Sequence, residues 1–425
     1  MADAGPVPVA LYAIFPNAGP AAGGTSVVIF GSGFQAGMSV TVGGASCAPL
    51  TVIAPGHLEC TTAAHAAGMV DVVATTAVSA TLPGAFRYQS NRQYVLYASD
   101  FDDSAVYTLS RDANAPFFTL QDSLDTGPSN SSAIVVHPNG QLVYLSNRGT
   151  GDLVRLRIDG TDGSVAVEGS PTTGFYGDTL AFDADGAYLY GLTFGGSLAV
   201  YAVDPSTGVL TELDDSPYAV AGAQFSGGAM SPDRRFFYGL EYNNGQVRAW
   251  ALDPDTGVPT EISGSPFDAG TSPTDIVFHP SGLHAYVSDS GLDAVIPYAV
   301  DPATGALTPG TPVPIPSPSL NPTAVAMHPL GTKLYVATWT PPRVYVYAIG
   351  ANGGLTPDGD ARFGGTQVSA MTVSPDGAYL AATPQQTEAI PVYALAPSGA
   401  ILSVEFVVVG NGATPTDAAW AVFDR

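Results

Sequence analysis

The sequence predicts an all-β protein: a small β-sandwich followed by a seven-bladed β-propeller with four-stranded blades, closed by its C-terminal strand. The first observation is a repeated unit of short apolar strand, turn and second strand. Its turns begin at residues 137, 183, 231, 279, 328 and 374, which are 46 to 49 residues apart. Such a period is typical of a repeat architecture. The second observation is four strands per repeat, and the third is a C-terminal match to a strand missing from the first repeat.

One repeat shows all four strands. Residues 275–278 form an inner strand, 285–288 a second, and 294–300 a third. The turn 301–305 (Asp-Pro-Ala-Thr-Gly) leads into a fourth strand at Leu307, with glycine supplying the positive φ. The same turn recurs at 204–208 and 253–257. Four strands in about 47 residues predict a propeller blade, because the coils of a β-solenoid are much shorter.

The first blade is split between the two ends of its domain. Residues 92–125 supply three strands with no inner strand before them. The missing strand is found at 415–420 (Pro-Thr-Asp-Ala-Ala-Trp), which matches 273–278 (Pro-Thr-Asp-Ile-Val-Phe). We therefore expect the C-terminal strand to close the ring, which removes exposed sheet edges. The predicted domains are 8–88 and 91–425.

Residues 8–88 read as short alternating strands between turns, which favours a β-sandwich. The segments are 11–15, the Gly-Gly-Thr at 23–25, 26–34 and 40–44. This pattern resembles the IPT/TIG immunoglobulin-like module, which also has a paired cysteine across its middle. The resemblance implies a spacer or a docking arm of a secreted or surface protein.

Both cysteines of the chain, Cys47 and Cys60, lie in this small domain. A disulfide between them would stabilise the domain by about 3 kcal/mol on the chain-entropy estimate. The alternative is a pair of buried free thiols in a cytosolic protein. We favour the disulfide, and with it an extracellular, cell-surface or periplasmic location. The start of the chain shows no signal peptide, and a removed leader would look the same.

Charge and hydropathy exclude two classes of partner. The net charge is −24, and Lys333 and the arginines total 13 residues without a basic cluster. Nucleic acids are bound by clustered Lys and Arg, so we expect no nucleic-acid partner. The chain has no run of 18 apolar residues, so we expect no membrane span.

The repeat itself resembles a known propeller family. Tyr298-Ala-Val-Asp-Pro, His328-Pro-Leu-Gly and Tyr335-Val are similar to lactonase-type seven-bladed propellers. That family includes 6-phosphogluconolactonases and a cycloisomerase, and the resemblance covers 91–425. Its enzymes share a Pro-His-x-His stretch that this chain lacks. The turn-initial His137, His279 and His328 suit turn capping better than a ligand ring, so no catalytic residue is carried over.

The candidate site follows from strand direction. The loops that lead into the inner strands, and those after the second strands, lie on one face of a propeller, where irregular residues gather and binding sites usually occur. The candidate binding residues on this face are Asp178, Asp275, Asp417, Arg148, Glu241, Asp289 and Trp339. Converging carboxylates could hold calcium, which prefers oxygen ligands. The alternative is that each Asp bonds nearby backbone N–H groups.

Three functions remain open. We favour a secreted or surface-displayed, non-catalytic propeller that binds a glycan, small molecule or protein, or serves as a scaffold. The second is a lactonase or isomerase that uses the acids and Arg148, and the third is a self-assembling surface-array subunit. No general base with a suitable pKa is identifiable near the channel, so lactonase turnover is expected to be absent or trivial. The N-terminal module should dock on the opposite, turn-bearing face near Asn91 and Arg425.

Overall fold

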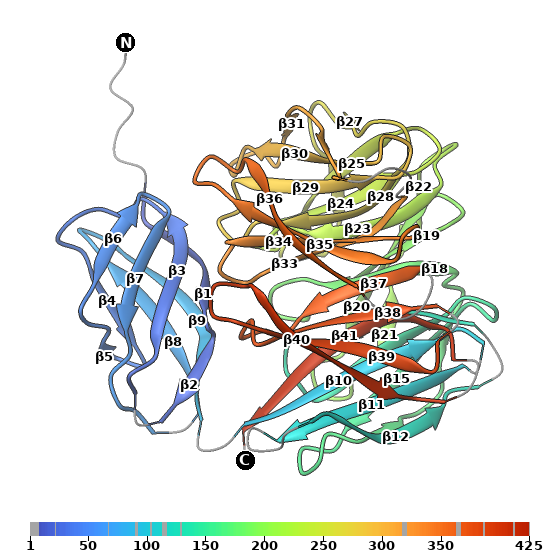
Figure 1. Ribbon diagram of the computed structural model, residues 1–425, viewed down its shortest axis with the longest axis horizontal. Coiled ribbons are helices and arrows are strands. Elements are labelled where there is room, and N and C mark those ends of the chain that lie inside the picture. The colour runs from blue at the N-terminus through green and yellow to red at the C-terminus, as the bar shows by residue number, and fades with distance from the viewer. Residues whose placement is uncertain are drawn as a thin grey trace.

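The structure is a computed structural model. It describes residues 8–21, 23–66, 68–89, 92–102, 104–112, 117–127, 130–316, 321–362, 367–385, 387–410 and 413–424. All regular secondary structure in these residues is β-strand, and it forms two bodies that lie side by side (Figure 1). None of the described segments is a helix able to cross a membrane.

The N-terminal module is a sandwich of two sheets. One sheet has the order β1 (Ala10–Phe15), β3 (Ser26–Ser32), β7 (His57–Thr61), β6 (Thr51–Ala54). The other has the order β2 (Ala18–Pro20), β9 (Ser79–Gln89), β8 (Gly68–Thr75), β4 (Ser39–Val42), β5 (Ala45–Ser46). Alternate apolar residues such as Val27, Ile29 and Val72 are fully buried between the sheets. The predicted disulfide is confirmed: the Sγ atoms of Cys47 and Cys60 are 2.11 Å apart, and the bond ties the end of β5 to β7.

Seven further sheets, one per blade, form the propeller in the described residues. The inner strands are β41 (Pro415–Asp424), β13 (Ser131–Val136), β18 (Gly177–Phe182), β23 (Phe225–Met230), β28 (Pro273–Phe278), β33 (Pro322–Met327) and β37 (Val368–Val373). The second strands are β10 (Arg92–Asp100), β14 (Leu142–Asn147), β19 (Tyr188–Thr193), β24 (Phe236–Glu241), β29 (His284–Asp289), β34 (Lys333–Thr338) and β38 (Tyr379–Pro384). The sequence-based prediction of an all-β propeller is thus confirmed.

The outer half of each blade varies more. The third strands are β11 (Ala105–Asp112), β15 (Asp152–Ile158), β20 (Ser197–Val203), β25 (Gln246–Leu252), β30 (Ala294–Val300), β35 (Arg343–Ile349) and β39 (Ala389–Leu395). The outer strands are β12 (Thr119–Asp125), β16 (Val165–Val167), β21 (Leu210–Glu212), β26 (Pro259–Glu261), β31 (Leu307–Pro309), β36 (Leu355–Arg362) and β40 (Ile401–Val408). In four blades a second short piece, β17 (Thr172–Thr173), β22 (Tyr218–Ala219), β27 (Phe267–Asp268) or β32 (Val313–Pro314), pairs with the same third strand. The outer strand is therefore interrupted there, which the sequence did not predict.

The C-terminal strand closes the ring as predicted. β41 pairs with β10 in antiparallel register from Arg92↔Asp424 to Asp100↔Pro415. Its Trp420 and Ala421 are buried against neighbouring blades. Closure pairs the free edge of β10, which would otherwise be exposed.

In the described residues, buried tyrosines tie six of the seven blades to the next blade. The hydroxyl of a second-strand tyrosine donates to a glycine carbonyl in the outer hairpin of the following blade. The pairs are Tyr97–Gly163, Tyr144–Gly208, Tyr190–Gly257, Tyr238–Gly305, Tyr286–Gly353 and Tyr335–Gly399, with distances of 2.6 to 3.0 Å. Burial raises the pKa of these phenols, so they stay protonated donors.

The module docks on the face that carries the turns between inner and second strands (Figure 1). The ring of Phe15 lies 5.6 Å from that of His328, and the ring of Phe30 lies 5.9 Å from that of His279. Arg87 Nη1 donates to the carbonyl of Val422 at 3.1 Å. The contacts therefore reach from β41 across to the blades of β28 and β33, leaving the opposite mouth of the channel uncovered. Asn91 and Arg425, which we expected at this face, lie outside the described residues.

Candidate functional site

Every inner strand carries a β-bulge near its start, at the uncovered mouth. The register shifts fall between Ser131/Ala133, Gly177/Thr179, Phe225/Gly227, Pro273/Asp275, Pro322/Ala324 and Val368/Met371, and opposite Thr416 in β41. A bulge inserts an unpaired residue and turns its side chain in a new direction, which is frequent beside active sites. The second residue of each strand is consequently re-aimed.

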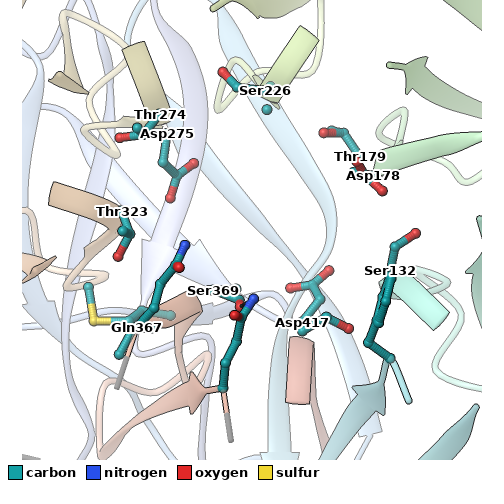
Figure 2. Close-up of a pocket in the computed structure, with 18 of the residues that line it drawn as sticks. Ser132, Asp178, Thr179, Ser226, Thr274, Asp275, Thr323, Gln367, Ser369 and Asp417 are labelled. Carbon is teal, nitrogen blue, oxygen red and sulfur yellow. Dashed lines mark hydrogen bonds between the residues drawn. The ribbon is translucent and has the colours of Figure 1, made fainter. Parts of the chain in front are cut away.

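The side chains at these second positions form a ring that we call the hydroxyl belt. Its members are Ser132, Asp178, Ser226, Thr274, Thr323, Ser369 and Thr416, so six are hydroxyls and one is a carboxylate. All of them except Thr416 are labelled in Figure 2. Four of the hydroxyls donate to the first carbonyl of the next inner strand. These bonds run from Ser132 to Gly177 (3.0 Å), Ser226 to Pro273 (2.8 Å), Thr274 to Pro322 (2.9 Å) and Thr416 to Ser131 (2.8 Å). The belt therefore links neighbouring blades at the channel wall.

The belt is interrupted at three positions. Ser369 Oγ instead accepts a hydrogen bond from Gln385 Nε2 at 2.9 Å. Thr323 Oγ1 and Asp178 Oδ1 are buried atoms with no hydrogen-bond partner among the described residues. A buried polar atom without a partner is costly, so such atoms in a cavity wall indicate where a ligand atom could bond.

Asp178 has a cationic partner. Arg148, which follows β14, places Nη1 3.2 Å from Asp178 Oδ2, and its guanidinium lies 5.0 Å from the ring centre of Phe194. Burial raises the pKa of Asp178, while the charge of Arg148 and the nearby Ser132 hydroxyl oppose that rise. Two of the predicted residues, one from each of two blades, thus form an ion pair at the mouth.

Asp275 and Asp417 occupy the position after the bulge in β28 and β41. Each carboxylate accepts the N–H of the next residue in its own strand, at 2.8 Å. Each also accepts an N–H from the neighbouring inner strand: Val325 to Asp275 at 2.9 Å, and Ile134 to Asp417 at 3.0 Å. The alternative that we considered, local bonding to backbone N–H groups, therefore describes both residues.

The same two carboxyl groups titrate near neutrality. Burial raises the pKa of Asp275 to about 6 and that of Asp417 to about 7, and the charge of Asp275 adds to the rise at Asp417. A carboxylate with a pKa near the working pH is suited to general-base chemistry. The expectation that no base of suitable pKa is available near the channel was therefore wrong. Burial in the channel wall causes the shift, and no local sequence pattern reports it.

These groups line one cavity of about 850 Å³ (Figure 2). Its charged residues are Asp102, Arg148, Asp178, Asp275 and Asp417, and most of the others are polar or small. Figure 2 shows Asp178, Asp275 and Asp417 on separate inner strands around this space. Such a wall, with many hydrogen-bonding groups and few large apolar ones, suits a small polar molecule.

The other predicted site residues lie elsewhere. Glu241 is buried and accepts bonds from Arg248 Nε and Asn244 Nδ2, both at 2.6 Å. Asp289 is buried and accepts backbone N–H groups from its own and the preceding loop. Trp339 is 47% exposed, and none of the three lines the cavity. The hydroxyl belt was missed by the sequence analysis, although alignment of the second residues of the inner strands would have shown it.

The structure supports turn capping by the repeated histidines. Nδ1 of His137, His279 and His328 each accepts the N–H two residues ahead, at 3.1 to 3.2 Å. Across the described part of the chain, no three His, Cys, Asp or Glu side chains come together in a way that could hold a metal ion. Calcium therefore stays a prediction.

Comparison with known proteins adds family and fold. The IPT/TIG domain model matches residues 8–88. A search of curated proteins finds no match. Among solved structures, a putative 6-phosphogluconolactonase from Bacteroides uniformis has a TM-score of 0.67 at 18% identity, over 77% of this chain and 99% of that one.

Two more solved structures are similar. The periplasmic gluconolactonase PpgL of Pseudomonas aeruginosa has a TM-score of 0.65 at 18% identity, over 77% of this chain and 99% of its own. A protein from Lactobacillus plantarum has a TM-score of 0.68 at 19% identity, over 78% and 99%. At these identities the structures support the fold alone. The family model described as lactonase, 7-bladed beta-propeller matches residues 115–224 and 228–414, more than half of the chain, which therefore belongs to that family.

Proposed function

We propose that the uncovered mouth of the propeller binds a small polyhydroxylated molecule of the sugar-lactone or sugar-acid class. The observation that carries this proposal is the pair of unpartnered buried atoms, Asp178 Oδ1 and Thr323 Oγ1, in the wall of a polar cavity of about 850 Å³. A ligand hydroxyl can donate to the carboxylate, and a ligand oxygen can accept from the threonine. Arg148 adds a donor for a carbonyl or carboxylate oxygen.

Hydrolysis of a sugar lactone is the second candidate. It is favoured by the lactonase family and by the pKa of about 7 for Asp417. Near neutral pH a large fraction of Asp417 is ionised and able to take a proton from an attacking water. Arg148 would stabilise the oxyanion that forms at the lactone carbonyl. The structural neighbours named as gluconolactonases make this reaction class the one to test.

One set of variants separates binding from hydrolysis. D-glucono-1,5-lactone turnover is followed by acid release above the spontaneous rate, and gluconate binding by calorimetry. Thr323→Val and Asp178→Asn should each weaken gluconate binding about tenfold, as expected for loss of one buried hydrogen bond. Asp417→Asn should abolish turnover while gluconate still binds. Leu283→Ala, at an exposed position in a turn on the opposite face and outside both cavities, is the matched control and should change neither.

Each outcome decides something. Binding without turnover supports the non-catalytic function. If gluconate binds and the lactone is turned over, and if Asp417→Asn abolishes that turnover, the result supports the hydrolase. If neither gluconate nor the lactone binds at the mouth, both proposals are wrong.

We further propose that the protein works outside the cytosol, with the N-terminal module as spacer or docking arm. The Cys47–Cys60 disulfide supports this, because such bonds persist in oxidising compartments.

Self-assembly also stays a prediction. Its best-suited described segment is the outer strand β40, where Leu402, Phe406 and Val408 are 67%, 46% and 65% exposed. An exposed apolar edge strand is a template for pairing with another chain.

A further inference from the structure

The turn after β23 departs from the repeat at one residue. In five other turns between inner and second strands, the fourth position is a glycine with φ between 67° and 74°; these are Gly140, Gly186, Gly282, Gly331 and Gly377. The equivalent residue in the turn after β23 is Arg234, with φ of 58°. A side chain in the left-handed region is strained, and such outliers persist where something compensates for them. The backbone bond of the turn is kept, since Arg234 N donates to Ser231 O at 2.9 Å.

Arg234 is an exposed residue, and its guanidinium makes one described hydrogen bond. Nη1 donates to the carbonyl of Phe182 at 2.8 Å. No described carboxylate forms an ion pair with it, although the charge of Asp183 favours its protonated form. An arginine has five N–H donors, so a guanidinium with one of them engaged has others available to a ligand.

Arg234 faces a second cavity, of about 630 Å³, between the N-terminal module and the turn face of the propeller. The module contributes Tyr12, Asn17 and Arg87, and the propeller contributes Asn139 and Asp183 with Arg234. Sites for small molecules are frequent at domain interfaces. This cavity is separate from the one lined by Asp178 and Asp417 at the other mouth.

The charges around this cavity leave Arg234 without a counter-ion. Asp233 is occupied by Arg235 Nε at 2.7 Å, and Asp376 accepts from the Tyr94 hydroxyl at 2.6 Å. Asp183 accepts the N–H of Tyr188 at 3.0 Å, and burial raises its pKa. Arg87 brings a second guanidinium to the cavity from the module. Two guanidinium groups from two domains suit an oxyanion, which accepts several charge-assisted hydrogen bonds at once.

We propose that the cavity between the module and the propeller is a second binding site, specific for a small oxyanion, with Arg234 as its principal cation. The ligand carries a carboxylate or a phosphate. Because the walls come from both domains, the bound anion also ties the module to the turn face. This site does not depend on the ligand proposed for the uncovered mouth.

The test uses the full chain with inorganic phosphate and gluconate as separate probes, against sodium chloride of equal ionic strength. Arg234→Gly restores the residue of the five equivalent turns, so it should fold and melt at the same or a higher temperature. Affinity for the preferred anion should fall about tenfold to 100-fold, as expected for loss of a charge-assisted hydrogen bond. The two probes distinguish a phosphate ligand from a carboxylate ligand.

Asp178→Asn, at the other mouth, is the control and should leave phosphate binding unchanged. Gluconate binding that responds to Asp178→Asn and not to Arg234→Gly would place that ligand at the uncovered mouth and overturn the proposal for carboxylates. Unaltered phosphate affinity in Arg234→Gly, or no binding of either probe, would overturn the proposal altogether.

Discussion

The two mouths of one channel are built from the two ends of the same seven strands, yet they differ in regularity. At the turn face the strands end in near-identical turns, where His137, His279 and His328 cap the turn backbone. At the uncovered face each strand begins with a bulge, and the hydroxyl belt there is complete in some blades and interrupted in others. At the turn face the same hydrogen bonds recur from blade to blade, whereas at the uncovered face individual blades lack the bond that their neighbours make.

The contrast teaches where a repeat protein can vary. In a turn that caps its own backbone, the fourth residue needs a positive φ, which is strained for a side chain such as that of Arg234. A bulged residue is already outside the regular strand pairing, so its replacement removes side-chain hydrogen bonds but leaves the pairing intact. Asp178 replaces the hydroxyl residue of the other blades, and Thr323 keeps the hydroxyl without a described hydrogen-bond partner. Both line the cavity that we assign to a ligand.

The largest effect should come from removing the strand that reaches both faces. β41 carries Asp417 near one mouth and contacts the module through Val422 at the other. Truncation before Pro415 exposes the edge of β10 and removes buried Trp420. We expect loss of cooperative thermal unfolding, far beyond the few kcal/mol of a point change. A truncated chain that melts like the full chain would contradict the closure of the ring by β41.

The two faces should also respond to pH in opposite directions. Burial lowers the pKa of His279 and His328 from 6.5 to about 4. Their contribution to the free energy of unfolding is therefore present above pH 6.5 and is lost as the pH falls towards 4. Asp275 and Asp417 have pKa values raised to about 6 and 7 from 3.8. The contribution of these two carboxyl groups to the free energy of unfolding is present below pH 3.8 and is lost as the pH rises through 6 to 7.

Variants at the two faces separate these contributions. Between pH 4 and 6.5, Asp417→Asn should make the free energy of unfolding rise more steeply with pH, because the opposing carboxyl is gone. His328→Asn should make that rise shallower. Denaturant unfolding across this pH range gives the slopes, which are insensitive to a constant loss of stability in either variant. Equal slopes in both variants would show that the groups at the two faces do not affect the pH dependence of the free energy of unfolding in opposite directions.

The smallest effect distinguishes intact from interrupted parts of the belt. Thr274→Val removes the hydrogen bonds of this hydroxyl to the Pro322 carbonyl and to Ser288, and should destabilise the protein by about 1 to 2 kcal/mol. Thr323→Val removes no described hydrogen bond, so its stability should change by less than about 0.5 kcal/mol. Melting temperatures of the two variants, side by side, provide the measurement. A loss at Thr323 as large as that at Thr274 would mean that its hydroxyl has a structural partner.

The fold followed from the sequence because its signals are local and repeated. The period of the turns predicted the blades, and the match of 415–420 to 273–278 predicted the closing strand that pairs with β10. The site was only partly predictable. Strand direction placed Asp178, Asp275, Asp417 and Arg148 at one mouth, where they line a common cavity.

What the sequence did not show depends on burial and on contacts between blades. The raised pKa values of Asp275 and Asp417 arise from desolvation in the channel wall. The hydroxyl of Thr323 has no described hydrogen-bond partner, whereas that of Thr274 in the neighbouring blade bonds the Pro322 carbonyl, and only the structure shows this difference. Both are properties of the assembled ring.

The central claim is that the uncovered mouth, and specifically its interrupted belt, binds a small polyhydroxylated ligand. The most direct test is a crystal structure of the full chain soaked with gluconate, compared with the unsoaked crystal. We predict difference density in the cavity between Asp178 and Thr323, with a ligand oxygen within hydrogen-bonding distance of each, and a lower ligand occupancy in Thr323→Val crystals soaked at a sub-saturating gluconate concentration. Density confined to other surfaces, or an unchanged mouth at saturating gluconate, would contradict the assignment of this face to ligand binding.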